Sequence, residues 1–280
     1  MSHADRVCLR GIEMAYEEHG AGTRPLVLVH GFTGSRDDWR EMLPRLAARG
    51  RTLAPDLRGH GDSSNPGNAE GYTFEQLAAD LGAFLTAVDV PRCDLLGHSM
   101  GGMVALRLAL AEPARVDSLL LMDTSAEPIP RGARAIFEAS AKIARESGMQ
   151  ALYQVGRVAS ERQSDRPASF VRSIERMGAE VFWDRIRAKL LAMDPVAYAT
   201  LGPALIEDAG VADRLAEIRC PTTVLVGVED AAFRRPSERL ARDIPGARLV
   251  VIKAAAHSPQ LENPEAWLAA VLAHLARVRA

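Results

Sequence analysis

The sequence predicts an α/β fold: a mostly parallel, eight-stranded sheet with helices on both faces and an inserted helical cap. Short runs rich in strand formers alternate with stretches of helical periodicity, the pattern of βα units. The run LVLVH at 26–30 is continuously apolar, as is typical of a strand buried on both faces. The alternation stops between 125 and 204, where only helical patterns occur. These features together indicate one large α/β domain carrying a helical insertion.

Composition and charge limit the classes of function. The chain has 280 residues and a formal net charge of −2, which gives no reason to expect nucleic acid or an anionic membrane as partner. No segment approaches the roughly 18 apolar residues of a membrane span, and the first residues lack the apolar region of a secretory signal. Cys8, Cys93 and Cys220 are odd in number and widely spaced. We therefore expect reduced thiols and a cytoplasmic location.

The first half of the core begins with two strands that meet at Gly11. Thr73 precedes a helical pattern with Glu75 and Gln76 in its first turn, which predicts an N-cap there. The elements expected up to the insertion are strands at 6–10, 12–18, 26–30, 51–54, 93–97 and 116–122, and helices at 39–48, 75–87 and 100–111.

The βα alternation resumes after the insertion. The expected elements are a strand at 222–227, a helix from about 236, a strand at 248–252 and a closing helix from about 264. Between the two halves, helical periodicity covers 135–147, 170–177 and 181–191, separated by Gly148, Pro167 and Pro195. A crossover between parallel strands needs about a dozen residues, and this segment has roughly eighty. We therefore expect a core of residues 1–124 and 205–280 and a cap of residues 125–204, with ordinary crossover helices as the alternative.

The stretch GHSMG at 97–101 places Ser99 between a buried strand and the start of a helix. A G-x-S-x-G pattern alone is a weak signal, but the strand–turn–helix setting is that of a nucleophile elbow. There the glycines relieve crowding in a sharp turn, and the serine hydroxyl projects at the carboxyl end of the sheet. The amide of Met100 lies at a helix N-terminus, where it can stabilise a developing oxyanion.

Several further motifs follow one another in the order expected for the α/β-hydrolase superfamily, and the chain resembles that superfamily. Besides GHSMG, the matching stretches are HGFTGS at 30–35, DLRGHGDS at 56–63, GVED at 227–230 and AHSP at 256–259. The combination is most similar to the branch of serine esterases, enol-lactonases and cofactor-free haloperoxidases. The resemblance covers the chain outside the insertion and implies a Ser-His-Asp triad.

A serine nucleophile needs a base and a carboxylate that orients the base. His257 follows the strand at 248–252 and follows Ser99 in the order of this fold, although Ala256 stands where the family usually has glycine. His98 adjoins the serine and cannot easily turn back onto it. Asp230 matches the family's acid. Asp123, at the end of the strand at 116–122, is a rival, and Glu229 is expected to leave the turn in another direction.

The resemblance also implies an oxyanion hole formed by the backbone amides of Phe32 and Met100. His30 and the 56–63 stretch are interpreted as structural. The apolar residues of the insertion are candidates either for an acyl pocket or for the core of the cap: Phe137, Met149, Tyr153, Phe182 and Trp183.

The expected activity is hydrolysis of a small carboxylic ester or lactone through an acyl-enzyme, without cofactor or metal. The alternatives are a carbon–carbon bond hydrolase, a perhydrolase or haloperoxidase on the same residues, and a non-catalytic ligand-binding homologue. Ser258 stands where carbon–carbon bond hydrolases usually have tryptophan, which disfavours the first alternative. The sequence indicates neither the physiological substrate nor the oligomeric state.

Overall fold

The computed structural model describes residues 5–129 and 134–279, which form an eight-stranded sheet in the order β1-β2-β4-β3-β5-β6-β7-β8. All eight predicted strands are present within about one residue of their expected positions. They are β1 (Asp5–Leu9), β2 (Ile12–His19), β3 (Leu26–Val29), β4 (Thr52–Pro55), β5 (Cys93–His98), β6 (Val116–Met122), β7 (Thr222–Gly227) and β8 (Arg248–Ile252).

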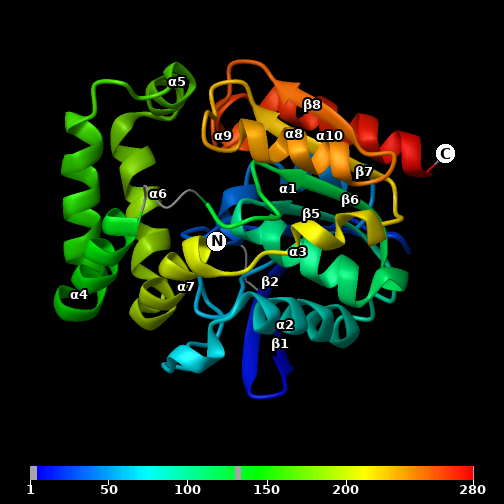
Figure 1. Cartoon of the computed structure of the whole chain (residues 1–280), viewed down its shortest axis with the longest axis horizontal. Helices are drawn as coiled ribbons and strands as arrows, with labels where there is room; N and C mark the ends of the chain where they lie inside the picture. Colours follow the sequence, from blue (N-terminus) through cyan, green and yellow to red (C-terminus); the bar gives the residue numbers. More distant parts are fainter. Residues whose placement is uncertain (1–4, 130–133, 280) are drawn as a thin grey trace.

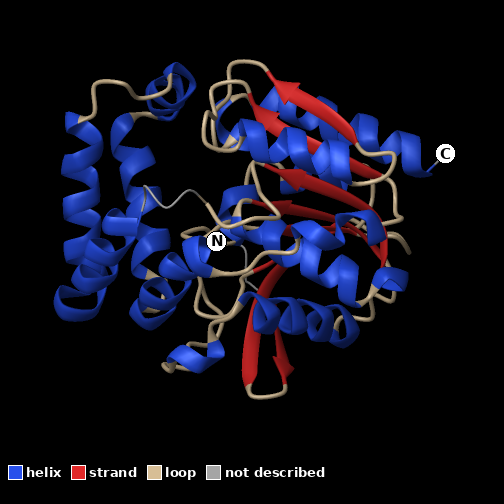
Figure 2. Cartoon of the chain, in the orientation of Figure 1, coloured by secondary structure: helices blue, strands red, loops and turns tan. Residues whose placement is uncertain are grey.

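The sheet is mostly parallel, as predicted. Strand β2 runs antiparallel to both of its neighbours, β1 and β4, and the pairings from β4 through β8 are all parallel. The carboxyl ends of these parallel strands therefore lie at one edge of the sheet (Figure 2). Polar side chains that follow different strands can meet at this edge.

Helices cover both faces of the sheet. On one face lie α2 (Phe74–Ala87), α3 (Met100–Ala111) and α8 (Arg234–Asp243), and on the other lie α1 (Leu43–Ala47) and α10 (Pro264–Arg279). Alternate residues of one strand serve the two layers: Val27 packs under α2 and α3, and Leu28 packs in the cluster that contains α10. Thr73 caps α2 as predicted, since its side chain accepts a hydrogen bond from the amide of Gln76.

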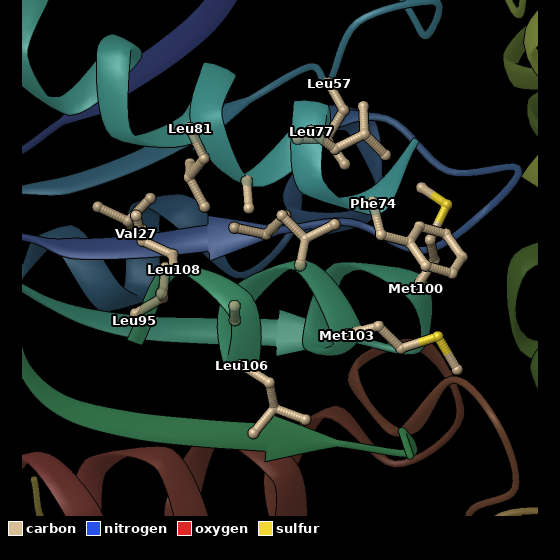
Figure 3. Packing of buried hydrophobic residues seen from close by; sticks show 14 of the residues in the cluster. Val27, Leu57, Phe74, Leu77, Leu81, Leu95, Met100, Met103, Leu106 and Leu108 are labelled. Carbon is tan, nitrogen blue, oxygen red and sulfur yellow. The ribbon is translucent and has the colours of Figure 1, made fainter. Parts of the chain in front are cut away.

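The layer beneath α2 and α3 is the larger of the two apolar clusters. Leu77 and Leu81 of α2 point toward Leu108 of α3 and toward Val27 and Leu95 of the sheet (Figure 3). Each of these five side chains is 1% exposed or less. Burying a leucine or valine contributes about 1.5–3 kcal/mol, so this layer fixes α3, and with it the turn at its N-terminus.

The described residues between β6 and β7 form four α-helices, namely α4 (Arg134–Arg162), α5 (Ala168–Met177), α6 (Ala179–Leu191) and α7 (Pro195–Glu207). Figure 1 shows them beyond the carboxyl ends of the strands. Gly148 has a φ of 80° and interrupts α4 as the sequence indicated, but a second helical segment follows it. The expected end of the insertion at residue 204 falls inside α7. None of the helices in the two described ranges is long and apolar enough to cross a membrane.

Charged side chains connect these helices to the core. Arg185 of α6 donates to Asp37 at 2.7 Å and to Glu41 at 2.6 Å. One turn further along α6, Lys189 pairs with Asp38, and both side chains are nearly buried. Asp37 and Asp38 belong to a short 3₁₀ helix, η1 (Arg36–Trp39), that follows β3. The insertion is therefore attached beside the loop that the sequence assigned to the oxyanion hole.

Candidate active site

Ser99 lies in a strained turn between β5 and α3. Its φ of 51° and ψ of −119° are unfavourable for a residue with a side chain. The flanking glycines make this turn possible. A Cβ on Gly97 would lie 2.4 Å from the carbonyl oxygen of Gly101, and a Cβ on Gly101 would lie 2.4 Å from that of His30. Strain of this kind persists only where the surroundings enforce it, and it holds the serine at the carboxyl end of the sheet.

Hydrogen bonds fix the backbone of Ser99 on both sides. Its amide donates to the carbonyl of Met122 at 2.9 Å, and its carbonyl accepts from the hydroxyl of Thr124 at 2.6 Å. Met100 is the first residue of α3, so its amide has no intrahelical acceptor. The positive end of the helix dipole thus adjoins the serine hydroxyl.

The loop after β3 approaches Ser99 closely because its second residue, Gly31, has no side chain. A Cβ on Gly31 would lie 3.3 Å from the Cβ of Ser99. His30 accepts from the amide of Leu57 at 2.9 Å through Nε2 and therefore donates through Nδ1 to the carbonyl of Gly31 at 2.8 Å. Burial lowers the pKa of His30 to about 3, which keeps this ring neutral. Nε2 of His60 lies 2.6 Å from the carbonyl oxygen of Phe32. Both histidines hold the loop, in agreement with a structural role.

His257 and Asp230 meet at the same edge of the sheet. Nδ1 of His257 lies 2.7 Å from Oδ2 of Asp230, although 27 residues separate them in the sequence. The imidazole also packs against Phe233, with 4.8 Å between ring centroids. Burial alone would raise the pKa of Asp230, but the hydrogen bond and charge of His257 outweigh burial and hold it below its usual value. The carboxylate is therefore ionised and able to support an imidazolium.

The two rival acids make their hydrogen bonds to groups other than His257. Glu229 points toward α5, where Oε2 accepts from the amide of Ser169 at 2.8 Å and Oε1 accepts from Arg172 at 3.3 Å. Asp123 is fully buried after β6, and its Oδ1 accepts from the amide of Gly227 at 2.9 Å. Of the three candidate acids, Asp230 is the one hydrogen-bonded to His257.

Two residues near His257 were not predicted from the sequence. His98 turns away from Ser99, and its Nε2 donates to the carbonyl of His257 at 2.6 Å. Burial lowers the pKa of His98 to about 3, so it stays neutral. Glu262 lies in α9 (Pro259–Glu262), where it accepts from the amide of Ala256 and, at 3.3 Å, from the hydroxyl of Ser169. Both residues hold the backbone of the histidine loop. The bond of His98 spans 159 residues and leaves no local motif, whereas Glu262 lies six residues after Ala256.

Ser99 and His257 line a cavity of about 330 Å³ between the sheet edge and the inserted helices. Phe137 and Phe182, two of the five pocket candidates, contribute to its wall. Tyr153 and Trp183 line a neighbouring apolar cleft, which shares Phe182 and Thr33 with this cavity. Met149 is buried in the large core cluster. The remaining apolar wall of the cavity is formed by Phe32, Ile129, Phe170, Ile186, Leu205, Phe233 and Leu261.

One group of side chains in the described residues has the composition of a metal site: Asp123, Asp230 and His257, with ligand atoms within 4.8 Å of one another. Two ligands of a tetrahedral zinc, each about 2.0–2.2 Å from the ion, lie roughly 3.3 Å apart. The 2.7 Å between His257 and Asp230 is shorter and is that of a direct hydrogen bond. The geometry therefore fits a proton between these two groups better than an ion.

Comparison with known proteins gives relatives over nearly the full length. The family described as alpha/beta hydrolase fold matches residues 24–264. RutD of Variovorax paradoxus (strain S110), provisionally named a carbamate hydrolase, is 32% identical, with 95% of this chain and 97% of that protein aligned. A thermophilic esterase from Thermogutta terrifontis is 32% identical, with a TM-score of 0.82 and 100% of both chains covered. The enol-lactonase from Burkholderia xenovorans LB400 is 26% identical, with a TM-score of 0.83, over 97% of this chain and 100% of that chain.

These relatives differ in the reactions that their names describe, but all three names are those of hydrolases, and the two solved structures share the fold of this chain. The family match covers far more than half of the chain, and the strand order and strand–turn–helix at Ser99 agree with it. The chain therefore belongs to the α/β-hydrolase family and is a hydrolase.

Proposed function

We propose that the protein is a serine hydrolase that cleaves a small carboxylic ester or lactone through an acyl-enzyme. Ser99 is the nucleophile, His257 the general base and Asp230 the acid that orients it. The amides of Phe32 and Met100 form the oxyanion hole. The observation that carries this proposal is the direct bond between His257 and Asp230, in a cavity that the strained Ser99 also lines.

The chemistry follows from these positions. His257 takes the proton of the Ser99 hydroxyl as its oxygen attacks the carbonyl carbon, and the two amides stabilise the resulting oxyanion. The tetrahedral intermediate collapses, the carbon–oxygen bond to the leaving group breaks, and His257 returns the proton to the departing alkoxide. Water, deprotonated by His257, then attacks the acyl-enzyme and releases the carboxylic acid and Ser99. With a lactone, the alkoxide and the acyl group are parts of one molecule, so the product is a hydroxy acid.

The cavity supports a small substrate with an apolar acyl group. A volume of about 330 Å³ lies at the lower end of the range for small-molecule pockets, roughly 300–1,000 Å³. Aromatic and aliphatic side chains form most of its wall, and the ion pair of Asp38 and Lys189 forms one polar patch. We propose that residues 125–204 act as the cap, because α4, α5 and α6 each contribute to this wall. Cys8, Cys93 and Cys220 are free thiols, which supports the proposed cytoplasmic location.

The test is a panel of short-chain esters and lactones assayed with the wild type, Ser99→Ala and the control Ser147→Ala, an exposed serine of α4. We expect hydrolysis by the wild type and the control and a loss of about 10⁴-fold or more in kcat for Ser99→Ala. Rapid mixing with an activated ester should give a burst of alcohol equal to the enzyme concentration. Hydrolysis retained in Ser99→Ala would refute the role of Ser99. A folded wild type that turns over no ester or lactone but binds one would favour the ligand-binding alternative.

A further inference from the structure

Asp123 is a buried carboxyl group for which the proposed mechanism has no use. It follows β6, its relative exposure is 0%, and its φ of 45° is unusual for a residue other than glycine. Oδ1 accepts from the amide of Gly227 at 2.9 Å, and its own amide donates to the carbonyl of Leu225. Oδ2 is buried and has no donor among the described residues. One oxygen of Asp123 is thus fixed to β7, and the other needs an explanation.

The groups facing Asp123 are mostly acidic. A carboxylate oxygen of Asp123, one of Asp230 and a ring nitrogen of His257 all lie within 4.8 Å of one another. Glu262 of α9 contributes a further negative potential at Asp123. The imidazole of His257 is within reach, but its Nδ1 is already bonded to Asp230. Asp123 therefore lacks the donors that would stabilise it as an anion.

Two adjacent buried carboxyl groups cannot both be ionised when a single imidazole is their partner. Asp230 holds the charge, since His257 and the amide of Phe233, at 3.3 Å, both donate to it. Burial, the charge of Asp230 and that of Glu262 together raise the pKa of Asp123 well above its usual value. A protonated Oδ2 of Asp123 would be a donor, and Asp230 is the acceptor beside it.

We propose that Asp123 is a positioning residue of the triad: it remains a neutral carboxylic acid and donates its O–H to the carboxylate of Asp230, which in turn holds His257. This inference rests on the proposed function of the triad. In it, Asp123 does not replace Asp230 as the acid that orients His257 but donates a hydrogen bond to Asp230. The hydrogen bond spreads the negative charge of Asp230 and so limits how tightly His257 retains a proton. The same hydrogen bond also links the ends of β6 and β7, because Asp123 follows β6 and Asp230 follows β7.

The proton can be observed without any assay of activity. At pH 7, an infrared difference spectrum of wild type minus Asp123→Asn should show the C=O stretch of a protonated carboxyl group. The matched control is Asp94→Asn: Asp94 is equally buried but faces Arg24 at 2.6 Å and Arg279 at 2.8 Å, so its difference spectrum should show carboxylate bands. Carboxylate bands lost in Asp123→Asn would overturn the inference even if Ser99 and His257 act as proposed.

The pH profile of kcat/KM tests the link to His257. Asparagine retains a donor toward Asp230 and an acceptor for the amide of Gly227, whereas alanine has neither. In Asp123→Ala, Asp230 becomes more basic and His257 holds its proton to higher pH, so the acid limb should move upward, with a loss of about fivefold at pH 7. Asp123→Asn should recover most of that loss. If Asp123 is ionised, Asp123→Asn removes a negative charge near His257, and its acid limb moves downward by about one unit instead. That result would contradict the inference.

Discussion

The sheet and the inserted helices are stabilised in different ways. In the sheet, β3 buries all four of its residues and β5 all six, and the helices on both faces pack against them with apolar side chains. In the insertion, α5 buries two serines, and α6 buries Phe182 alone of its thirteen residues. Arg185 and Lys189 of α6 attach to the core through ion pairs. Helices α5 and α6 thus have little apolar packing of the kind that makes the core rigid, whereas α4 and α7 bury residues such as Leu152 and Leu201 in the large apolar cluster.

The core and the insertion also contribute different parts of the candidate site. Ser99, Asp230 and His257 and the amides of Phe32 and Met100 all belong to the core, where buried strands hold them in place. The insertion contributes much of the apolar wall of the cavity. Substitutions in the core should therefore change catalysis or folding, and substitutions in the insertion should change substrate access and affinity.

The largest effect should come from Asp230→Asn, which tests the chemistry of the core. The amide cannot stabilise an imidazolium and favours the wrong tautomer of His257, so kcat should fall about 10⁴-fold with little change in KM. Steady-state kinetics with an activated ester would measure this loss. The control is Asp213→Asn, an exposed aspartate of the 3₁₀ helix at Ala212–Glu217. Equal activities of the two variants would remove Asp230 from the mechanism.

Lys189→Met tests the attachment of the insertion. It leaves Asp38 buried without its cation, which costs about 3 kcal/mol when one partner of a buried pair is removed. Burial alone raises the pKa of Asp38, and Lys189 outweighs it, so the folded pKa lies below the usual value. The stability from this pair is present above the unfolded pKa and is lost as pH falls through the folded pKa.

We expect Lys189→Met to raise KM and to speed proteolysis within the insertion more than it changes kcat. Limited proteolysis and kinetics at two salt concentrations would measure both effects. The double variant Asp38→Asn/Lys189→Met removes both charges and should recover part of the loss. If kcat falls as much in Lys189→Met as in Asp230→Asn, the insertion affects catalysis as strongly as the core does, which would contradict the proposed difference between the two regions.

Gly101→Ala should give a moderate effect in the core. The new Cβ would meet the backbone carbonyls of His30 and Val29 at 2.4 and 2.5 Å, and backbone atoms at the end of β3 yield only with strain. Overpacking of this kind costs about 1–3 kcal/mol, and the oxyanion loop should shift with it. Urea denaturation would measure the stability, and a parallel assay should show a loss of activity. A variant as stable as the wild type would mean that the turn is less crowded than described.

Gly156→Ala, in the insertion, should give the smallest effect and the opposite sign. Gly156 lies in α4 with open space around its Cα, so alanine should stabilise the helix by about 0.5–1 kcal/mol. Thermal unfolding measured beside Gly101→Ala gives the comparison directly. Destabilisation of similar size by both substitutions would show that the insertion is packed as tightly as the core.

The sequence predicted the core better than the insertion for a physical reason. Continuous apolar runs such as 26–30 mark strands buried on both faces, and shorter runs rich in strand formers located the remaining strands. Helix α7 was not predicted because it begins at Pro195 and contains Pro203. Pro195 stands in the first turn, where proline is favourable, and Asp194 caps the helix, so the unfavourable residue is Pro203 inside the helix. Tertiary packing against α4 outweighs this local preference, and residues such as Ala197 and Leu201 are fully buried.

The residues of the candidate site also differ in how well the sequence predicts them. Ser99, Asp230 and His257 stand in local motifs that the sequence reveals, and the structure brings the last two into contact. The role of His98 depends on a carbonyl 159 residues away, and that of Glu262 depends on Ser169 in the insertion. Such contacts follow from the three-dimensional arrangement of the chain and have no signature in a single sequence.

The most direct test of the central claim is labelling by a fluorophosphonate probe, followed by peptide mapping, on the wild type, Ser99→Ala and His257→Ala. The probe reports an activated serine without knowledge of the substrate. We predict one equivalent of label on Ser99 in the wild type, none in Ser99→Ala, and a greatly slowed reaction in His257→Ala. Absence of label on a folded wild type, or label on another residue, would contradict the assignment of Ser99 as the nucleophile.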